Sequence, residues 1–194
     1  MIMNKLSRPI ILHGEKVSLL PLEKSHFENL IALAKEKSIW QHYTIDGSDP
    51  EVLGQSLNSS LTDTLQYPFV IMLRETGTVI GSTRFLDIQP DHNKLEIGWT
   101  WLHPDYWHTK INTECKLMLL TFCFEELMVS RVQLKTDENN IRSRKAILKI
   151  GAQFEGLLRN DMIRHNGTKR NSAYFSIIDT EWHEVKEKLI ALLS

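Results

Sequence analysis

Between residues 95 and 112 the pattern of hydrophobic positions changes from the period of a strand to the period of a helix. Apolar side chains first alternate with polar ones, which predicts a strand with one apolar face made by Leu95, Ile97, Trp99 and Trp101. Beyond Pro104, apolar residues recur at helical spacing over 113–127. A strand therefore leads through a short loop into a helix. The backbone N–H groups at such a helix start favour an anion, most often a phosphate.

The other segments predict a mixed sheet flanked by helices, an α+β fold. We expect strands at 16–21, 68–74, 78–86, 131–136, 153–164 and 169–178, and helices at 23–39, 50–65 and just before Gly151, with a terminal helix that carries Trp182, Val185, Leu189 and Leu192. Residues 75–77 and 166–167 are turn sequences, so each joins two strands of a hairpin. The strand-helix-strand order over 95–136 predicts one parallel pair in a mostly antiparallel sheet.

Composition changes this picture little. The chain has 194 residues, 42% of them hydrophobic and 24% charged, with a net charge of -1. These values fit one domain over 1–194 and give no reason to expect binding to nucleic acid or to a membrane. Cys115 and Cys123 lie on one predicted helix about 12 Å apart, too far for a disulfide, so we expect buried thiols in a reducing compartment. No run approaches the ~20 apolar residues of a membrane span and no signal peptide is evident, so we expect a cytoplasmic protein.

Three motifs, together with the order of the elements, resemble the GNAT-family N-acetyltransferases. The motifs are EIGWTWLHPDYWHTKINTE at 96–114, NNIRSRKAILKIGAQFEG at 139–156 and SIIDTEW at 176–182. Within that family the chain is similar to the RimJ/RimL-like branch, the ribosomal-protein N-terminal acetyltransferases. The most specific feature is the spacing of Asn140, Ser143, Gly151 and Gly156. The resemblance implies a central twisted sheet that opens between its fourth and fifth strands.

The resemblance also implies that acetyl-CoA binds in this opening, with its diphosphate on the loop before the central helix. The implied cofactor residues are Trp101, Leu102, His103, Trp107, His108, Thr109, Lys110, Ile111, Asn112, Thr113, Asn140 and Arg144. A backbone N–H near Trp101 or Leu102 would serve the oxyanion. Two members of this set have a second interpretation, because Asn140 is also typical of an Asx-turn and Arg144 of a solvated charge at a helix start.

The phosphate loop departs from the family at two positions. The family usually has glycine where Lys110 stands, and often at His108, because glycine lets the main chain approach a phosphate closely. The lysine and the histidine could add positive charge near a phosphate or could obstruct it. Lys110 could equally point to solvent from the first turn of the helix.

Two residues are candidates for the proton transfers of acetyl transfer to an amine. Ser143 matches the position whose hydroxyl donates a proton to the departing sulfur in the RimL-like branch. In many GNAT enzymes a tyrosine four residues later is the general acid, and here that position is Ile147. Ser143 is equally typical of a helix start. Glu96, on the central strand, is the candidate general base, directly or through water. Alternatively, Glu96 is an exposed strand residue that pairs with a lysine or an arginine.

The sequence gives weaker indications of where the amine acceptor binds than of where the cofactor binds. Aromatic and polar residues that could line it are Trp40, His42, Tyr43, Arg84, Trp99 and Trp101, although aromatic strand residues are also typical of a core. We expect an amine acceptor, either a protein N-terminus or a small amine. The histidines show no metal-ligand spacing, so we expect no metal. Some family members pair through the late hairpin and the sheet edges, which leaves a homodimer open.

Two functional hypotheses follow. The first is an acetyl-CoA-dependent N-acetyltransferase in which the amine attacks directly in a ternary complex. The second is a catalytically weakened GNAT-fold protein that binds CoA, a metabolite or a partner as a sensor. His108 and Lys110 distinguish them, because the first hypothesis requires that their side chains leave room for the cofactor.

Overall fold

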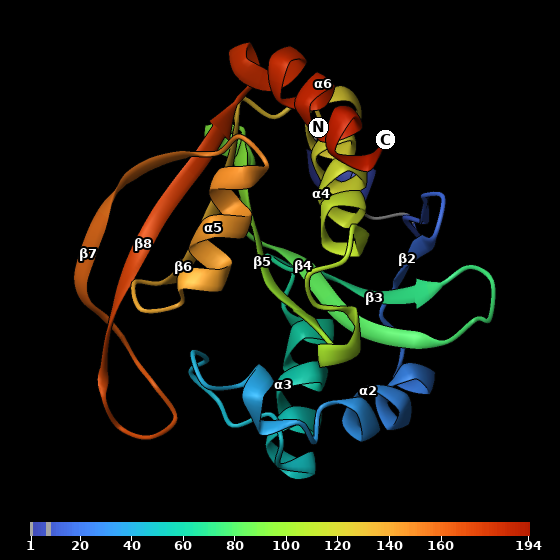
Figure 1. Cartoon of the computed structure of the whole chain (residues 1–194), viewed down its shortest axis with the longest axis vertical. Coiled ribbons are helices and arrows are strands. Elements are labelled where there is room, and N and C mark those ends of the chain that lie inside the picture. The colour runs from blue at the N-terminus through green and yellow to red at the C-terminus, as the bar shows by residue number, and fades with distance from the viewer. Residues whose placement is uncertain (1, 7–8) are drawn as a thin grey trace.

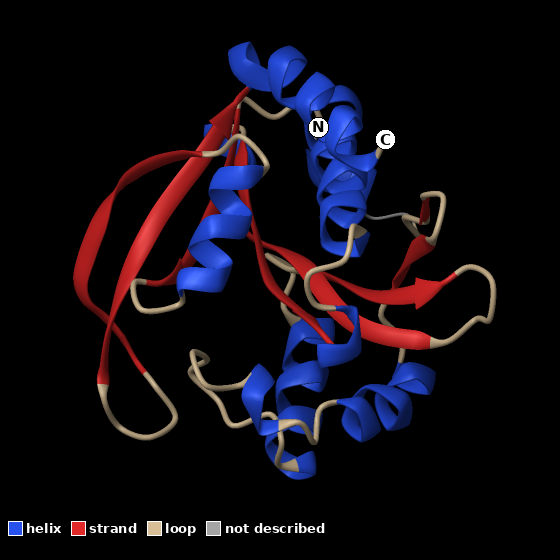
Figure 2. Cartoon of the chain, viewed as in Figure 1, coloured by secondary structure: helices blue, strands red, loops and turns tan. Residues whose placement is uncertain are grey.

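The computed structural model describes residues 2–6 and 9–194, and in these residues eight strands form one mixed sheet (Figures 1 and 2). The strands are β1 (Leu12–His13), β2 (Val17–Pro21), β3 (Tyr67–Leu73), β4 (Val79–Gln89), β5 (Lys94–Leu102), β6 (Arg131–Asp137), β7 (Gln153–Ile163) and β8 (Lys169–Ile178). Their order across the sheet is β1-β2-β3-β4-β5-β6-β8-β7. Within it, β5 and β6 pair in parallel, and the other neighbours are antiparallel. The predicted mixed sheet with its parallel pair is therefore confirmed.

Helices pack on the sheet in two groups, each with its own hydrophobic core. The helices are α1 (Ile2–Leu6), α2 (Phe27–Leu33), α3 (Pro50–Thr62), α4 (Ile111–Thr121), α5 (Ile141–Lys149) and α6 (Trp182–Leu193). One core joins α4 and α6 to the sheet and includes Cys115 and Cys123, which are buried free thiols as predicted. The second core joins α2 and α3 to the sheet around Trp40. Among the residues described, no helix combines the length and the apolar character needed to cross a membrane.

The prediction of one helix over 23–39 is wrong. This segment is a 3-10 turn (Lys24–His26), then α2, then a second 3-10 turn (Lys37–Ile39). The indole N–H of Trp40 donates to the carbonyl oxygen of Ala34 (2.7 Å), which a continuing helix would use for its own hydrogen bond. The buried indole therefore ends α2 early and turns the chain back towards the sheet.

Other boundaries agree with the sequence more closely. Asp49 caps α3, because its carboxylate accepts the N–H groups of Glu51 (2.9 Å) and Val52 (3.2 Å). This helix ends at Thr62, three residues before the predicted end, and leaves Leu65 half exposed. The predicted helix over 113–127 is α4 followed by a π-helical turn, Phe122–Glu126. The sequence analysis missed α1 and β1, which are too short to show a hydrophobic period.

The strict alternation predicted for β5 fails in its second half. Gly98 pairs with Arg84 of β4, and Trp101 pairs with Ser82, so the single residue Thr83 faces two residues of β5. This arrangement is a β-bulge, and Trp99 within it has a left-handed φ of 51°. Beyond the bulge, each side chain of β5 points to the face of the sheet opposite the one that regular alternation predicts. As a result Leu95 and Ile97 belong to the α4 core, whereas Trp101 belongs to the α2 and α3 core.

Candidate active site

A large cavity lies where β5 and β6 separate. The two strands pair only at 94–96 and 131–133, and beyond these residues they diverge (Figure 1). A cavity of about 740 Å³ occupies the opening, and its wall comes mainly from β5, β6 and the first turns of α4 and α5. Strands that part in this way leave backbone groups that a ligand can pair with in place of a neighbouring strand.

The N-terminus of α4 forms one end of the cavity. Asn112 and Thr113 line the wall. Among the described residues their N–H groups have no backbone acceptor, and the first helical hydrogen bond runs from Glu114 N to Lys110 O (3.0 Å). The indole N–H of Trp107 donates to Leu102 O (2.9 Å) and fixes the preceding loop. These free donors and the positive end of the helix dipole suit a phosphate group.

The two positions where the family usually has glycine differ from each other. His108 has a left-handed φ of 62°, at a cost of about 1 kcal/mol for a residue with a side chain, and it lies at the exposed rim of the cavity. Lys110 has an ordinary φ of -75°. Its Nζ donates to Leu193 O at the end of α6 (2.8 Å), and the residue is not part of the cavity wall. Lys110 therefore does not fill the cavity.

The structure brings most of the predicted cofactor residues together. Those that line the cavity are Trp101, Leu102, Trp107, His108, Thr109, Asn112, Thr113 and Asn140. Those that lie outside its wall are His103, Lys110, Ile111 and Arg144. Ile111 is buried in the core, and the guanidinium of Arg144 donates to Glu138 O (3.2 Å). The residues that line the cavity are therefore the ones whose side chains can contact a ligand there directly.

Asn140 and Ser143 lie together where β6 leads into α5. The side-chain oxygen of Asn140 accepts the backbone N–H of Ser143 (3.0 Å), so Asn140 is the N-cap of α5. Both residues line the cavity. The cap holds the first turn of α5 in place and positions Ser143 within the wall of the cavity.

Glu96 lies at the last paired position of β5, where the two strands begin to part. It is buried, lines the cavity, and accepts a hydrogen bond from Gln133 Nε2 (2.7 Å). Lys135 Nζ is 3.9 Å from the carboxylate. Burial raises the pKa of Glu96 above its ordinary value, although Lys135 and Gln133 oppose this effect. A carboxylate with a raised pKa is better suited to accept a proton near neutral pH.

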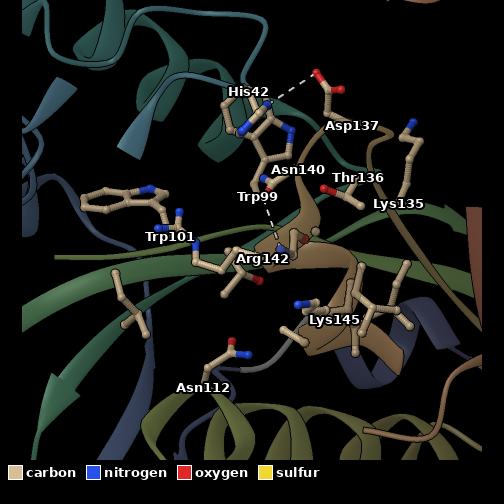
Figure 3. A pocket seen from close by; sticks show the side chains of 18 of the residues that line it. His42, Trp99, Trp101, Asn112, Lys135, Thr136, Asp137, Asn140, Arg142 and Lys145 are labelled. Carbon is tan, nitrogen blue, oxygen red and sulfur yellow. Dashed lines mark hydrogen bonds and ion pairs between the residues drawn. The ribbon is translucent and has the colours of Figure 1, made fainter. Parts of the chain in front are cut away.

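His42 and Asp137 lie at the end of the cavity opposite Asn112 and Lys145 (Figure 3). His42 Nδ1 is 3.7 Å from the Asp137 carboxylate, which also receives a hydrogen bond from Arg164 Nε (2.6 Å). Burial lowers the pKa of His42, so its imidazole is neutral at pH 7. Burial alone would raise the pKa of Asp137, but the hydrogen bond from Arg164 holds it below its ordinary value.

The predicted acceptor residues divide into two layers. Tyr43 and Trp99 line the cavity, whereas Trp40 and Arg84 lie behind its wall. Trp40 is buried with its ring centroid 5.1 Å from that of Tyr43, and the Arg84 guanidinium lies 4.6 Å from the ring of Trp99. Trp40 and Arg84 therefore support the residues in front of them.

Lys116 is a cavity residue that the sequence analysis missed. It lies on α4 one turn beyond Thr113, is buried, and donates from Nζ to Thr100 Oγ1 (2.7 Å). Thr100 in turn shares a hydrogen bond with Thr83 (2.7 Å). Burial lowers the pKa of Lys116 to about 8. The available signal was a lone lysine within an apolar helical face, but periodicity alone does not show what that face contacts.

Three comparisons with known proteins identify the family. Residues 16–153 match the family described as "Acetyltransferase (GNAT) domain". The uncharacterized N-acetyltransferase YoaA of Bacillus subtilis is 25% identical over 87% of this chain and 96% of its own length. The putative ribosomal N-acetyltransferase YdaF of the same organism is 30% identical over 57% of this chain and 59% of its own. A crystal structure of a putative acetyltransferase from T. thermophilus has a TM-score of 0.87 and 30% identity, and the match covers 96% of this chain and 98% of that one.

The chain belongs to the GNAT acetyltransferase family and is an N-acetyltransferase. The cavity between β5 and β6 lies at the opening where this family is expected to hold its cofactor. In the part of the chain that the structure describes, no group of three metal-ligating side chains could hold a metal ion.

The burial of Lys116 generates a prediction about stability and pH. Its pKa is about 8 in the folded protein and 10.5 in an exposed lysine, so unfolding takes up a proton between these values and stability rises with pH there. In urea unfolding, the free energy of unfolding of the wild type minus that of Lys116→Met should rise by at least about 1 kcal/mol from pH 7.5 to pH 10. Lys145→Met, which removes an exposed cavity lysine, should show no such rise. A flat difference for Lys116→Met would contradict the burial of its charge.

Proposed function

We propose that the protein transfers the acetyl group of acetyl-CoA to a primary amine by direct attack, with both substrates bound at once. The observation that carries this proposal is the cavity between β5 and β6, which connects a helix N-terminus to a wall of aromatic and titratable side chains. Such a cavity can hold a phosphate-bearing donor at one end and an amine at the other. The two reacting atoms then meet near the bulge of β5.

We place the donor against α4 and β5. The N–H groups of Asn112 and Thr113 would bind the diphosphate, with positive charge supplied by Lys145 and Lys149 at the cavity wall. The extended arm of the cofactor would run along the part of β5 that has lost its β6 partner. There a backbone N–H near Trp101 or Leu102 would bind the thioester oxygen as it becomes an oxyanion.

We assign the two proton transfers to residues of the cavity wall. The amine nitrogen attacks the thioester carbon, the carbon–sulfur bond breaks, and the nitrogen releases a proton to Glu96, directly or through water. The departing thiolate takes a proton from the Ser143 hydroxyl, which regains one from solvent. His42 is a second candidate for the base, because burial keeps its imidazole neutral at pH 7 and it faces the same cavity.

We place the protein in the RimJ/RimL-like branch and expect its acceptor to be a protein N-terminus or a small amine of similar shape. The support is the motif around Asn140 and Ser143, together with the similarity to YdaF, whose name describes a putative ribosomal N-acetyltransferase. The buried free thiols favour a reducing compartment such as the cytoplasm.

The cofactor site can be tested by removing a single backbone N–H. Proline is tolerated in the first turn of a helix, so Asn112→Pro should delete one phosphate donor and weaken acetyl-CoA binding at least about tenfold, or 1.4 kcal/mol. Asn112→Ala, which keeps the N–H, should bind within about threefold of the wild type. Calorimetry measures both affinities, and urea unfolding checks that the variants fold.

The wild type in the same experiment shows whether the cofactor enters the cavity at all. At a hundred times its dissociation constant, acetyl-CoA should stabilise the fold by about 2.7 kcal/mol in a thermal unfolding assay. If acetyl-CoA neither binds nor stabilises the wild type, the enzymatic proposal fails and a sensor of another ligand is favoured. Equal affinities for Asn112→Pro and Asn112→Ala would remove α4 from the phosphate site.

The acid role of Ser143 has a kinetic signature. Ser143→Ala should lower kcat about 100-fold and leave acetyl-CoA affinity nearly unchanged, because the hydroxyl acts on the departing sulfur. Ser143→Thr keeps a hydroxyl and should retain most of the rate. Release of free thiol measures kcat. A rate for the alanine variant equal to that of the wild type would exclude Ser143 as the acid.

A further inference from the structure

The acceptor end of the cavity contains a buried cation without an ion-pair partner. Arg170 of β8 is 9% exposed and lines the cavity. Its Nη1 donates to the carbonyl oxygen of His42 (3.3 Å), and its buried Nε has no acceptor among the described residues. Within the described part of the chain no carboxylate lies within 4.0 Å of the Arg170 guanidinium. A buried guanidinium with an unused donor is costly unless a ligand pairs with it.

A second arginine lines the same cavity. Arg142 of α5 lines the cavity, and its guanidinium lies 3.4 Å from the ring of Trp107. Figure 3 shows Arg142 between the His42 end and the Asn112 end of the cavity. Arg142 also has no ion pair within the residues that the structure describes. Burial raises the pKa of the Tyr43 hydroxyl, and the positive charges of Arg84, Arg142 and Arg170 oppose this rise, so all three guanidiniums lie near that hydroxyl.

Two of the three carboxylates of this region, Asp137 and Glu96, are already engaged by other groups. Arg164 holds the Asp137 carboxylate with two hydrogen bonds, from Nε (2.6 Å) and Nη2 (3.0 Å). Glu96 is bonded to Gln133 and faces Lys135. Asp137 and Asp161 both act on Arg170 at a longer range than an ion pair, and the buried Oδ2 of Asp161 has no hydrogen-bond partner among the described residues. The acceptor end therefore carries an excess of positive charge that an anionic ligand would balance.

We propose that the acceptor carries a carboxylate close to its reactive amine, and that Arg170 and Arg142 bind this carboxylate. This inference rests on the proposed acetyl transfer and names the substrate class of the same site. A guanidinium binds a carboxylate with two parallel hydrogen bonds, which would fix the direction of the neighbouring amine. The same arginines would repel polyamines and other acceptors with additional positive charge.

Two kinds of acceptor share this chemistry, and matched probes separate them. A free amino acid presents its own α-carboxylate, whereas an acidic protein N-terminus presents the side chain of its second residue. The first probe pair is L-alanine and L-alaninamide. The second pair is a peptide that begins Ser-Asp and the same peptide with Ser-Asn. In each pair the primary amine is retained and the negative charge is removed. The amine of L-alaninamide is also less basic than that of L-alanine, and the acetylated products do not carry this difference.

The kinetic test compares kcat/KM within each pair. For the wild type, the carboxylate member of at least one pair should be acetylated at least about tenfold more efficiently than its amide, as expected for charge-assisted hydrogen bonds. In Arg170→Gln and Arg142→Gln this ratio should fall below about three, mainly through KM. Arg159→Gln, which removes an exposed arginine of β7 outside the cavity, should keep the wild-type ratio. Arg142 is itself exposed, so its variant remains informative if the Arg170 variant does not fold.

Binding of the acetylated products provides a readout that does not need turnover. Calorimetry with CoA present should show that an N-acetylated carboxylate probe binds at least about tenfold more tightly than its amide, and that the Arg142→Gln variant loses the difference. Equal binding of carboxylate and amide in both pairs would overturn the proposal, as would a preference that survives in both arginine variants. Failure of the proposed function is separate, because it would show as failure of acetyl-CoA itself to bind or as no thiol release with any of the four probes.

Discussion

One extra residue in β5 bends this strand where it leaves β6, and the geometry of the whole site depends on that bend. Thr83 of β4 faces both Trp99 and Thr100, and Trp99 adopts a left-handed conformation that costs about 1 kcal/mol. Beyond the bulge, Thr100 turns towards α4 and accepts the hydrogen bond of Lys116. Trp101 turns to the opposite face and packs on Trp40, with ring centroids 5.4 Å apart. The packing on both faces of β5 stabilises the strained conformation of Trp99. The edge of β5 that no longer pairs with β6 forms part of the cavity wall.

The cavity has two ends with different chemistry. Its α4 end presents unpaired backbone donors and the positive end of a helix, which suit a phosphate-bearing donor. Its opposite end presents His42 with a carboxylate partner, aromatic rings and two unpaired arginines, which suit an amine with a nearby negative charge. Glu96 and Ser143 lie in the wall of the same cavity, as a reaction between the two substrates would require.

Periodicity and turn chemistry were sufficient to predict most of the architecture. The hairpins at Gly77 and Gly167 formed because both glycines adopt the positive φ that their turns require, 68° and 81°. The parallel crossover followed from the order of the elements. Long-range contacts were beyond this reasoning. The indole of Trp40 ended α2 through a hydrogen bond to Ala34, and the bulge at Trp99 reversed the faces of a strand whose sequence alternates regularly.

The same limit applies to the site. A family resemblance pointed to the strand, the loop, Asn140 and Ser143, but it did not predict that Asn140 caps α5, and side-chain direction decided which residues reach the cavity. Lys110 turns away to the end of α6, although its neighbours 107–109 lie in the wall. Lys116 and Arg170 come from α4 and β8, far apart in sequence, and the fold alone brings them to one cavity. No local pattern in the sequence carries that information.

Hydrogen–deuterium exchange with and without saturating acetyl-CoA tests the central claim most directly, because it reports where the cofactor lies along the backbone. The account predicts slower exchange in two separate segments, 98–102 of the bent strand and 111–114 at the start of α4, with little change at the sheet edge formed by β1 and β2. Slower exchange confined to other segments, or none at these two under conditions where acetyl-CoA is bound, would contradict the assignment of the opening between β5 and β6 as the cofactor site.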